Sequence, residues 1–183
     1  MRALRQALPI ASVEQRSQRL IERLESLDEL HGAASVGMYW PMQKRGEVDV
    51  RPLDAWLRER GRQVFYPFMS EIPGGLRTGF RLVSDPGELA HRGRPFVEPP
   101  AEAPEAGPGD LDLIVVPALA ADQCGNRIGH GSGFYDVTLP EHCPPGVAVV
   151  VVYHFQLLAE LPREAHDHRA SIVVTDETTL RCG

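Results

Sequence analysis

The sequence predicts an α/β fold, a three-layer sandwich in which a mostly parallel sheet is flanked by helices. Two valine-rich runs, residues 111–116 and 147–153, are apolar except for Asp112, as parallel strands are when helices cover both faces of their sheet. Strand and helix patterns also alternate along the chain, which favours right-handed crossovers between parallel strands. The 183 residues suffice for one domain, which we expect to span residues 1–183.

Two helices are predicted in the N-terminal half. Ser12 and Gln15 fit a capping box, and leucine and isoleucine follow at helical spacing, which predicts a helix over residues 13–30. Pro52 can occupy the first turn of a second helix, and Gly61 would end it.

Short strands are expected around these helices. Residues 33–40 have the pattern of a buried strand, and residues 63–66 that of a short strand ending before Pro67. A Pro-Gly-Gly turn then leads to an edge strand over residues 76–83.

The C-terminal half contains fewer additional elements. Residues 95–109 are rich in proline, alanine and glutamate, which predicts a loop crossing the surface. Residues 155–161 should form a short helix, and residues 172–175 a last strand.

Composition excludes several classes of protein. A net charge of −6 argues against a general nucleic-acid binder, and no apolar run approaches the roughly 20 residues of a membrane span. Three widely spaced cysteines suggest neither a disulfide framework nor a zinc site. We expect a cytoplasmic protein that neither binds nor crosses a membrane, either a monomer or a weakly associating dimer.

The most informative segment is the glycine-rich stretch that follows the first valine-rich strand. Four glycines fall within nine residues, at positions 125, 129, 131 and 133, with Arg127 among them and Asp136 just after. Glycines let backbone amides approach an anion, arginine offers a planar donor fork for phosphate, and aspartate can hold a magnesium ion. The pattern predicts a phosphate-binding turn between a buried strand and a helix.

Two familiar phosphate loops do not match this segment. A P-loop needs lysine and then serine or threonine after its last glycine, whereas Phe134 follows Gly133. Phe134 also stands where the dinucleotide fingerprint has its third glycine. From the glycines alone, a plain turn remains an equally good interpretation.

The run PALAADQCGNRIGHGSGFYD, residues 117–136, resembles the signature of the 5-formyltetrahydrofolate cyclo-ligase family, approximately PGxxFDxxGxRxGxGxGYYD. Other segments follow the same order and spacing, at residues 1–5, 39–50, 155–167 and 172–176. The resemblance covers nearly the whole chain. It implies a Rossmann-like fold of the NagB/RpiA/CoA-transferase-like type.

The resemblance also implies a reaction. In that family ATP drives closure of a ring on 5-formyltetrahydrofolate: the formyl oxygen is phosphorylated, the second folate nitrogen attacks, and phosphate leaves, giving 5,10-methenyltetrahydrofolate. The protein positions the reactants and neutralises charge. The implied ligands are ATP, Mg²⁺ and a reduced folate.

Site residues follow from the resemblance position by position. The catalytic residues would be Glu47, Arg127 and His130. The folate site would contain Trp40, Glu47, His130 and Phe134. Magnesium would be held by Asp136 and Asp167. The ATP site would comprise Arg2, Arg5, Arg127, Gly129, His130, Gly131, Ser132, Gly133, Phe134 and Tyr135. Without the resemblance, we would interpret Arg5 as a solvated charge, Trp40 as a core residue and Asp136 as a helix cap.

Two departures from the family pattern keep alternatives open. Met1 stands where the family has a lysine, and His130 where it has an arginine. The chain could therefore be an impaired member that binds nucleotide or folate, or a relative acting on another small molecule. If a charged His130 replaces the arginine, turnover should rise as the pH falls through the imidazole pKa.

Overall fold

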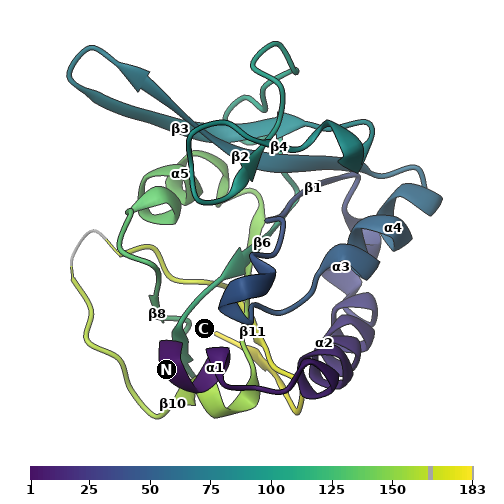
Figure 1. The fold of residues 1–183 in the computed structure, drawn as a ribbon, viewed down its shortest axis with the longest axis vertical. Helices are drawn as coiled ribbons and strands as arrows, with labels where there is room; N and C mark the ends of the chain where they lie inside the picture. The colour runs from purple at the N-terminus through teal and green to yellow at the C-terminus, as the bar shows by residue number, and fades with distance from the viewer. Residues whose placement is uncertain (165–166, 183) are drawn as a thin grey trace.

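The computed structural model describes residues 1–164 and 167–182, and its centre is a seven-stranded sheet (Figure 1). The strand order is β12-β11-β9-β6-β1-β2-β3. The inner strands run parallel, and the two outermost strands, β3 and β12, are antiparallel to their neighbours. The strands are β1 (Ser35–Gly37), β2 (Gln63–Ile72), β3 (Gly75–Leu82), β6 (Leu113–Pro117), β9 (Val147–Val151), β11 (Ile172–Val174) and β12 (Thr179–Arg181).

Helices cover the two faces of this sheet (Figure 1), which confirms the predicted α/β sandwich. Side chains of β6 alternate between the two cores: Leu113 packs with α2, α3 and α4, whereas the next residue, Ile114, packs with α5. Burial on both faces explains why this strand is continuously apolar. The helices are α1 (Arg2–Gln6), α2 (Ile10–Glu25), α3 (Asp28–Gly32), α4 (Arg51–Glu59) and α5 (Phe134–His142).

The predicted helix over residues 13–30 was wrong at both ends. The helix α2 starts earlier, with Pro9 as its N-cap and no side-chain cap bond, so Ser12 does not cap it. It ends at Glu25, and α3 is a separate short helix. Proline is well suited to a helix start, where a missing N–H costs no hydrogen bond.

The predicted strand over residues 63–66 was too short, because β2 continues through Pro67. β1 pairs with β2 only as far as Phe65, while β3 pairs along the other side of β2 to the turn. Pro67 therefore has an unpaired strand edge on one side, where its missing N–H is tolerated. The predicted edge strand is confirmed as β3.

The C-terminal half also departs from prediction. A single 3-10 turn, η3 (His154–Gln156), and the two-residue strand β10 (Leu157–Leu158) replace the helix expected at residues 155–161. The side chain of Gln156 accepts a hydrogen bond from the Tyr153 N–H and donates one to the Leu119 carbonyl oxygen. These bonds hold the segment in a tight turn against the connection that follows β6. The strand β12 was not predicted.

The expected surface loop at residues 95–109 contains one short strand. This strand, β5 (Val97–Glu98), pairs with β4 (Ala90–His91) beside the β2–β3 hairpin. Two further 3-10 turns are η1 (Gln43–Arg45) and η2 (Pro86–Glu88). Across the described residues, none of the helices combines the length and apolarity needed to span a membrane.

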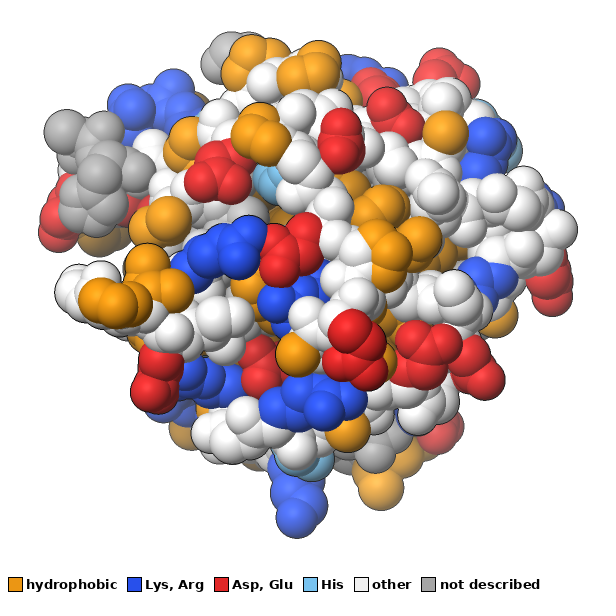
Figure 2. Space-filling view, turned by 90° about the horizontal axis from the view of Figure 1, so that it is seen from above, with side chains coloured by type: hydrophobic (Ala, Val, Ile, Leu, Met, Phe, Trp, Pro, Cys, Tyr) orange, Lys and Arg blue, Asp and Glu red, His pale blue; other side chains and the backbone are white. Residues whose placement is uncertain are grey.

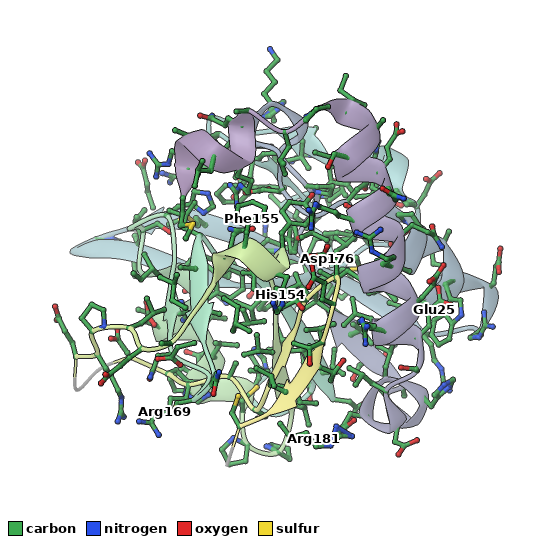
Figure 3. The ribbon with its side chains drawn as sticks, turned by 90° about the horizontal axis from the view of Figure 1, so that it is seen from below. Glu25, His154, Phe155, Arg169, Asp176 and Arg181 are labelled. Atoms are coloured by element: carbon green, nitrogen blue, oxygen red, sulfur yellow. The ribbon has the colours of Figure 1, made fainter. Side chains whose placement is uncertain are left out.

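The buried carboxylate of Asp176 links the end of the sheet to α2 (Figure 3). It accepts hydrogen bonds from Arg16 at 2.6 Å, from Arg19 at 3.2 Å and from the backbone N–H of His154 at 2.7 Å. A charge this deeply buried is stabilised only by such partners. The cluster fixes α2 relative to the C-terminal strands.

Candidate active site

The sequence suggested that the glycine-rich segment follows β6 directly, but the structure differs. A hairpin of β7 (Ala120–Asp122) and β8 (Arg127–Ile128) comes between them, and β10 completes a three-stranded sheet with it. Gly125 belongs to the hairpin turn, where its φ is +82° and a Cβ would lie 2.2 Å from the Ala170 carbonyl oxygen. Gly125 therefore serves packing, and only the three later glycines form the open loop.

Asp122 anchors the hairpin that carries Arg127. Its buried carboxylate accepts hydrogen bonds from the backbone of Cys124, Asn126 and Leu161 and from the Asn126 side chain, at 2.8 to 3.0 Å. Burial alone would raise the pKa of the Asp122 carboxyl, but these hydrogen bonds outweigh it and hold the pKa below its usual range. The turn is thus fixed to the segment beyond β10.

Replacing Asp122 by alanine should destabilise the protein by about 3 kcal/mol, because buried N–H groups lose a charged acceptor. In the wild type the lowered pKa stabilises the fold above the unfolded-state value of about 4, and this stabilisation is lost as the pH falls through the folded-state pKa. Urea unfolding at neutral pH and in acid measures both effects. A variant as stable as wild type at neutral pH would show that the carboxylate is not the anchor.

The loop between β8 and α5 borders a cavity of about 410 Å³. Gly131 and Gly133 have φ values of +89° and +67°, and no atom lies within 4 Å of a Cβ built on either. Gly133 is also the N-cap of α5, so unbonded backbone N–H groups of the first turn lie beside the loop. The cavity is lined by residues 127–136, residues 162–164 and Asp167.

Charged groups in this cavity suit an anion together with a divalent cation. Arg127 donates to Asp136 at 2.7 Å, its side chain is only 4% exposed, and its Nε is buried without a hydrogen-bond partner. An unpaired buried N–H is costly, and a phosphate oxygen would satisfy it. The arginine is thus available to an anion, although part of its guanidinium is bound to Asp136.

Asp136 and Asp167 line the same cavity. Asp167 accepts the backbone N–H of Glu164 at 2.7 Å, and neighbouring His166 lies outside the described residues. No group of three or more metal-binding side chains occurs among the residues described. Magnesium commonly takes one or two carboxylates and completes its octahedron with waters and phosphate oxygens, so this donor set fits Mg²⁺ bound together with a nucleotide.

A second, more apolar cavity of about 440 Å³ also borders the loop. Trp40, Met69 and Phe96 contribute its walls, and Glu47 lines it as a buried carboxylate. Trp40 also packs edge-to-face on Tyr66, with centroids 6.0 Å apart, so it is both a core residue and a cavity wall. The two cavities share His130, Ser132, Phe134 and Tyr135.

Three polar side chains meet near the shared residues. Arg5 Nη2 lies 3.7 Å from Glu47 Oε1 and 3.3 Å from His130 Nε2, and His130 Nε2 lies 3.5 Å from the same glutamate oxygen. Glu47 Oε2 accepts the Met42 N–H at 2.7 Å, while Oε1 is buried without a hydrogen-bond partner. Burial raises the pKa of the Glu47 carboxyl, and the Met42 bond and Arg5 oppose this. An N–H group of a ligand could satisfy Oε1.

His130 does not carry the positive charge of the arginine that occupies this position in the family pattern. Burial, assisted by Arg5, Arg45 and Arg2, lowers the pKa of His130 to about 4, so the ring is neutral near pH 7. Because a guanidinium only donates, Nε2 accepts from Arg5 and the proton resides on Nδ1. A rise in turnover through the ordinary imidazole pKa is therefore no longer expected.

The predicted site residues differ in how they are placed. Arg5 is 2% exposed and donates to the carbonyl oxygens of Arg45 and Ala118, so it is not the solvated charge of the ordinary interpretation. Arg2 is exposed and lines neither cavity. Arg45, Arg94 and Arg163 line the cavities but were missed, because the sequence gives no signal for isolated arginines in loops.

The fold and the site together define a class of protein: an α/β protein with a glycine-rich loop, suited to an anion, that is shared by a polar cavity and an apolar one. Such an arrangement suits an enzyme that brings a nucleotide phosphate to a second, largely apolar small molecule. Comparison with known proteins specifies the family.

The model of the 5-formyltetrahydrofolate cyclo-ligase family matches residues 1–176. The 5-formyltetrahydrofolate cyclo-ligase of Escherichia coli (strain K12) is 29% identical over 181 residues, which is 96% of each chain. That of Mycolicibacterium smegmatis is 43% identical over 77 residues, 42% of this chain and 40% of the relative. The chain belongs to the 5-formyltetrahydrofolate cyclo-ligase family.

Solved structures agree with this assignment. The 5,10-methenyltetrahydrofolate synthetase of Aquifex aeolicus superposes with a TM-score of 0.81 at 31% identity, covering 98% of this chain and 87% of that one. A synthetase of the same name from Mycoplasma pneumoniae, at 18% identity, shares the fold with a TM-score of 0.73 and covers 95% and 93%.

Proposed function

We propose that this protein converts 5-formyltetrahydrofolate to 5,10-methenyltetrahydrofolate, with hydrolysis of ATP to ADP and phosphate. The observation that carries the proposal is the pair of cavities with a shared wall of His130, Ser132, Phe134 and Tyr135. A phosphate held in the polar cavity and a folate held in the apolar one would meet at that wall. Direct transfer of a phosphoryl group requires this proximity.

ATP would bind in the polar cavity. Backbone N–H groups at Gly129, Gly131 and Gly133 and the first turn of α5 would face its phosphates. Arg127 would donate its unpaired Nε to a phosphate oxygen. Arg5, held by backbone carbonyls and close to His130, supplies a fixed positive charge nearby.

Asp136 and Asp167 would hold Mg²⁺, which neutralises charge on the phosphates when bound. Support comes from their common cavity and from the partial exposure of the Asp136 side chain, 24%. Asp136 also pairs with Arg127, so metal binding and the orientation of the arginine would be coupled.

The reduced folate would occupy the apolar cavity with its reacting end toward the shared wall. Glu47 Oε1 would accept an N–H of the ring system, and Trp40 and Phe134 would pack against its faces. The Nδ1–H of His130 could donate to an oxygen at the reaction centre as a neutral hydrogen-bond donor. These residues orient the formyl oxygen and exclude water during the reaction.

A product assay tests the proposal. Purified protein with 5-formyltetrahydrofolate, ATP and magnesium should form methenyltetrahydrofolate, followed by absorbance, and omission of either ATP or magnesium should stop it. Absence of product with active-site binding intact would support the second candidate, a folate- or nucleotide-binding protein. That candidate is favoured by the neutral His130 and by Met1 at the position of the family lysine. Binding of ATP without reduced folate would indicate a different substrate.

The pH dependence of turnover should show no inflection from His130 between about pH 5.5 and pH 8, the range of an unperturbed imidazole. The lowered pKa of about 4 leaves its charge unchanged over this range. His130→Arg should raise kcat near neutrality, because it adds a fixed cation near the phosphates. A wild-type profile that rises in acid and is flat in His130→Asn would instead show that the imidazolium is the active form.

We infer that the enzyme is a single domain of residues 1–183 that acts on small molecules in the cytoplasm, as a monomer or weak dimer. Cys124, Cys143 and Cys182 are unpaired, which suits a reducing compartment. The net charge of −6 disfavours a nucleic-acid partner. Sedimentation of the purified protein would report its oligomeric state.

A further inference from the structure

Arg94 lies at the end of the apolar cavity that is remote from the reaction centre. It lines this cavity beside Met69 and Leu76 of the β2–β3 hairpin. Its Nη2 lies 3.6 Å from Glu71, which pairs directly with Leu76 across the hairpin. The shared wall with the polar cavity is formed instead by the loop before α5. The cavity thus extends from that loop to the hairpin.

The shape of the substrate matches a cavity that extends from the loop to the hairpin. A folate has its reacting formyl group on the reduced pterin, and its glutamate, with free carboxylates, at the opposite end of an apolar aminobenzoyl group. If the formyl group meets the phosphate at the shared wall, the glutamate must extend toward the hairpin. Pro95, Phe96 and Val97 would then cover the aminobenzoyl group.

Arg94 is suited to bind a carboxylate there. Its side chain is 24% exposed, so it is partly shielded from water, while its acidic neighbour Glu71 is 84% exposed and more distant than a hydrogen bond. Exposed ion pairs of this kind contribute little to the stability of the fold. The Arg94 guanidinium can therefore leave Glu71 and bind a ligand instead. Figure 2 looks onto the face on which β2, β3 and β4 lie, and there hydrophobic side chains are exposed next to basic and acidic ones.

The other basic residue in this cavity, Arg45, belongs to the opposite end. Its carbonyl oxygen accepts a hydrogen bond from Arg5 at 2.9 Å, and its charge helps to lower the pKa of His130. Arg45 is therefore near the reaction centre. At the hairpin end, Arg94 is the cationic side chain that lines the cavity among the described residues.

We propose that Arg94 binds a carboxylate of the glutamate tail of the folate and so selects glutamylated substrates. This inference rests on the proposed function, because it takes a reduced folate as the ligand. The guanidinium would form a charge-assisted, bidentate pair with the carboxylate in a partly shielded site. It makes Arg94 a residue of substrate specificity that does not take part in the chemical step.

The test compares 5-formyltetrahydrofolate with the primary amide of 5-formyltetrahydropteroate, in which an uncharged amide group replaces the glutamate. Arg94→Gln should weaken calorimetric binding of the first by about tenfold or more and leave binding of the second unchanged. In turnover, KM for 5-formyltetrahydrofolate should rise while kcat stays constant. Arg92→Gln, an exposed neighbour outside the cavity, is the matched control and should bind both ligands as wild type does.

Equal weakening for both ligands, or no change for either, would overturn the assignment. Glu71→Gln should bind 5-formyltetrahydrofolate at least as tightly as wild type, and weaker binding would also count against it. Because binding is measured without ATP, a wild type that binds the folate but forms no product refutes only the proposed reaction. A wild type that does not bind the folate refutes both.

Discussion

Replacing Asp136 by asparagine should lower ATP-dependent turnover by about a thousandfold, because a metal-binding charge next to the phosphates is lost. Asparagine keeps the shape of the side chain and an oxygen that can accept the 2.7 Å hydrogen bond from Arg127. The fold should therefore persist. Initial rates over a magnesium titration measure the effect, and the midpoint of thermal unfolding should change by only a few degrees.

Glu141→Gln provides the matched control for this experiment. Glu141 is an exposed carboxylate on the same helix, α5, and it does not line the polar cavity. Its replacement removes the same charge and should leave turnover unchanged. Full activity of Asp136→Asn would show that Asp136 is not a metal ligand. The assignment of Asp167 to the metal site would then lose its support as well.

Arg127→Lys should also reduce kcat/KM by about a hundredfold to a thousandfold, although the positive charge is kept. The planar guanidinium donates to Asp136 through Nη2 and carries a buried, unpaired Nε. A lysine ammonium cannot bind the carboxylate and a phosphate oxygen with this geometry. Steady-state kinetics with ATP as the varied substrate measures the loss.

Arg169→Lys is the corresponding control, because Arg169 contacts the same hairpin without lining either cavity. Its Nε donates to the Asn126 side chain at 3.2 Å. Activity close to wild type is expected for it. If Arg127→Lys were also close to wild type, a point charge would suffice and the proposed donor geometry would be wrong.

The central strands could be predicted because physical chemistry imposes a strong pattern on them. Strands buried on both faces must be continuously apolar, and residues 113–116 and 147–153 have this character. The start of α2 at Pro9 carries a sequence signal, because proline favours a helix start, but the capping-box pattern at Ser12 was followed instead. The path of β2 through Pro67 depends on where the neighbouring strand β1 stops, which is tertiary information.

The site was predicted in part. The resemblance identified the residues of the loop, and the structure brings Glu47, Arg5 and His130 together from distant parts of the chain. The β7–β8 hairpin escaped prediction because strands of two and three residues have no detectable periodicity. Gly125 was consequently interpreted as part of the phosphate loop.

The charge state of His130 was beyond sequence reasoning for a related reason. An imidazole has an ordinary pKa near neutrality, and only burial with three arginines nearby lowers it to about 4. These arginines come from α1 and from η1, so their proximity to the ring is a property of the fold.

We propose that a phosphate in one cavity reacts directly with a folate in the other across the wall that they share. Isotope transfer tests this reaction: 5-formyltetrahydrofolate labelled with oxygen-18 in the formyl group is incubated with the enzyme, ATP and magnesium. The label should appear in inorganic phosphate in proportion to methenyltetrahydrofolate formed. Product formed with unlabelled phosphate, or ATP hydrolysed without product, would contradict it.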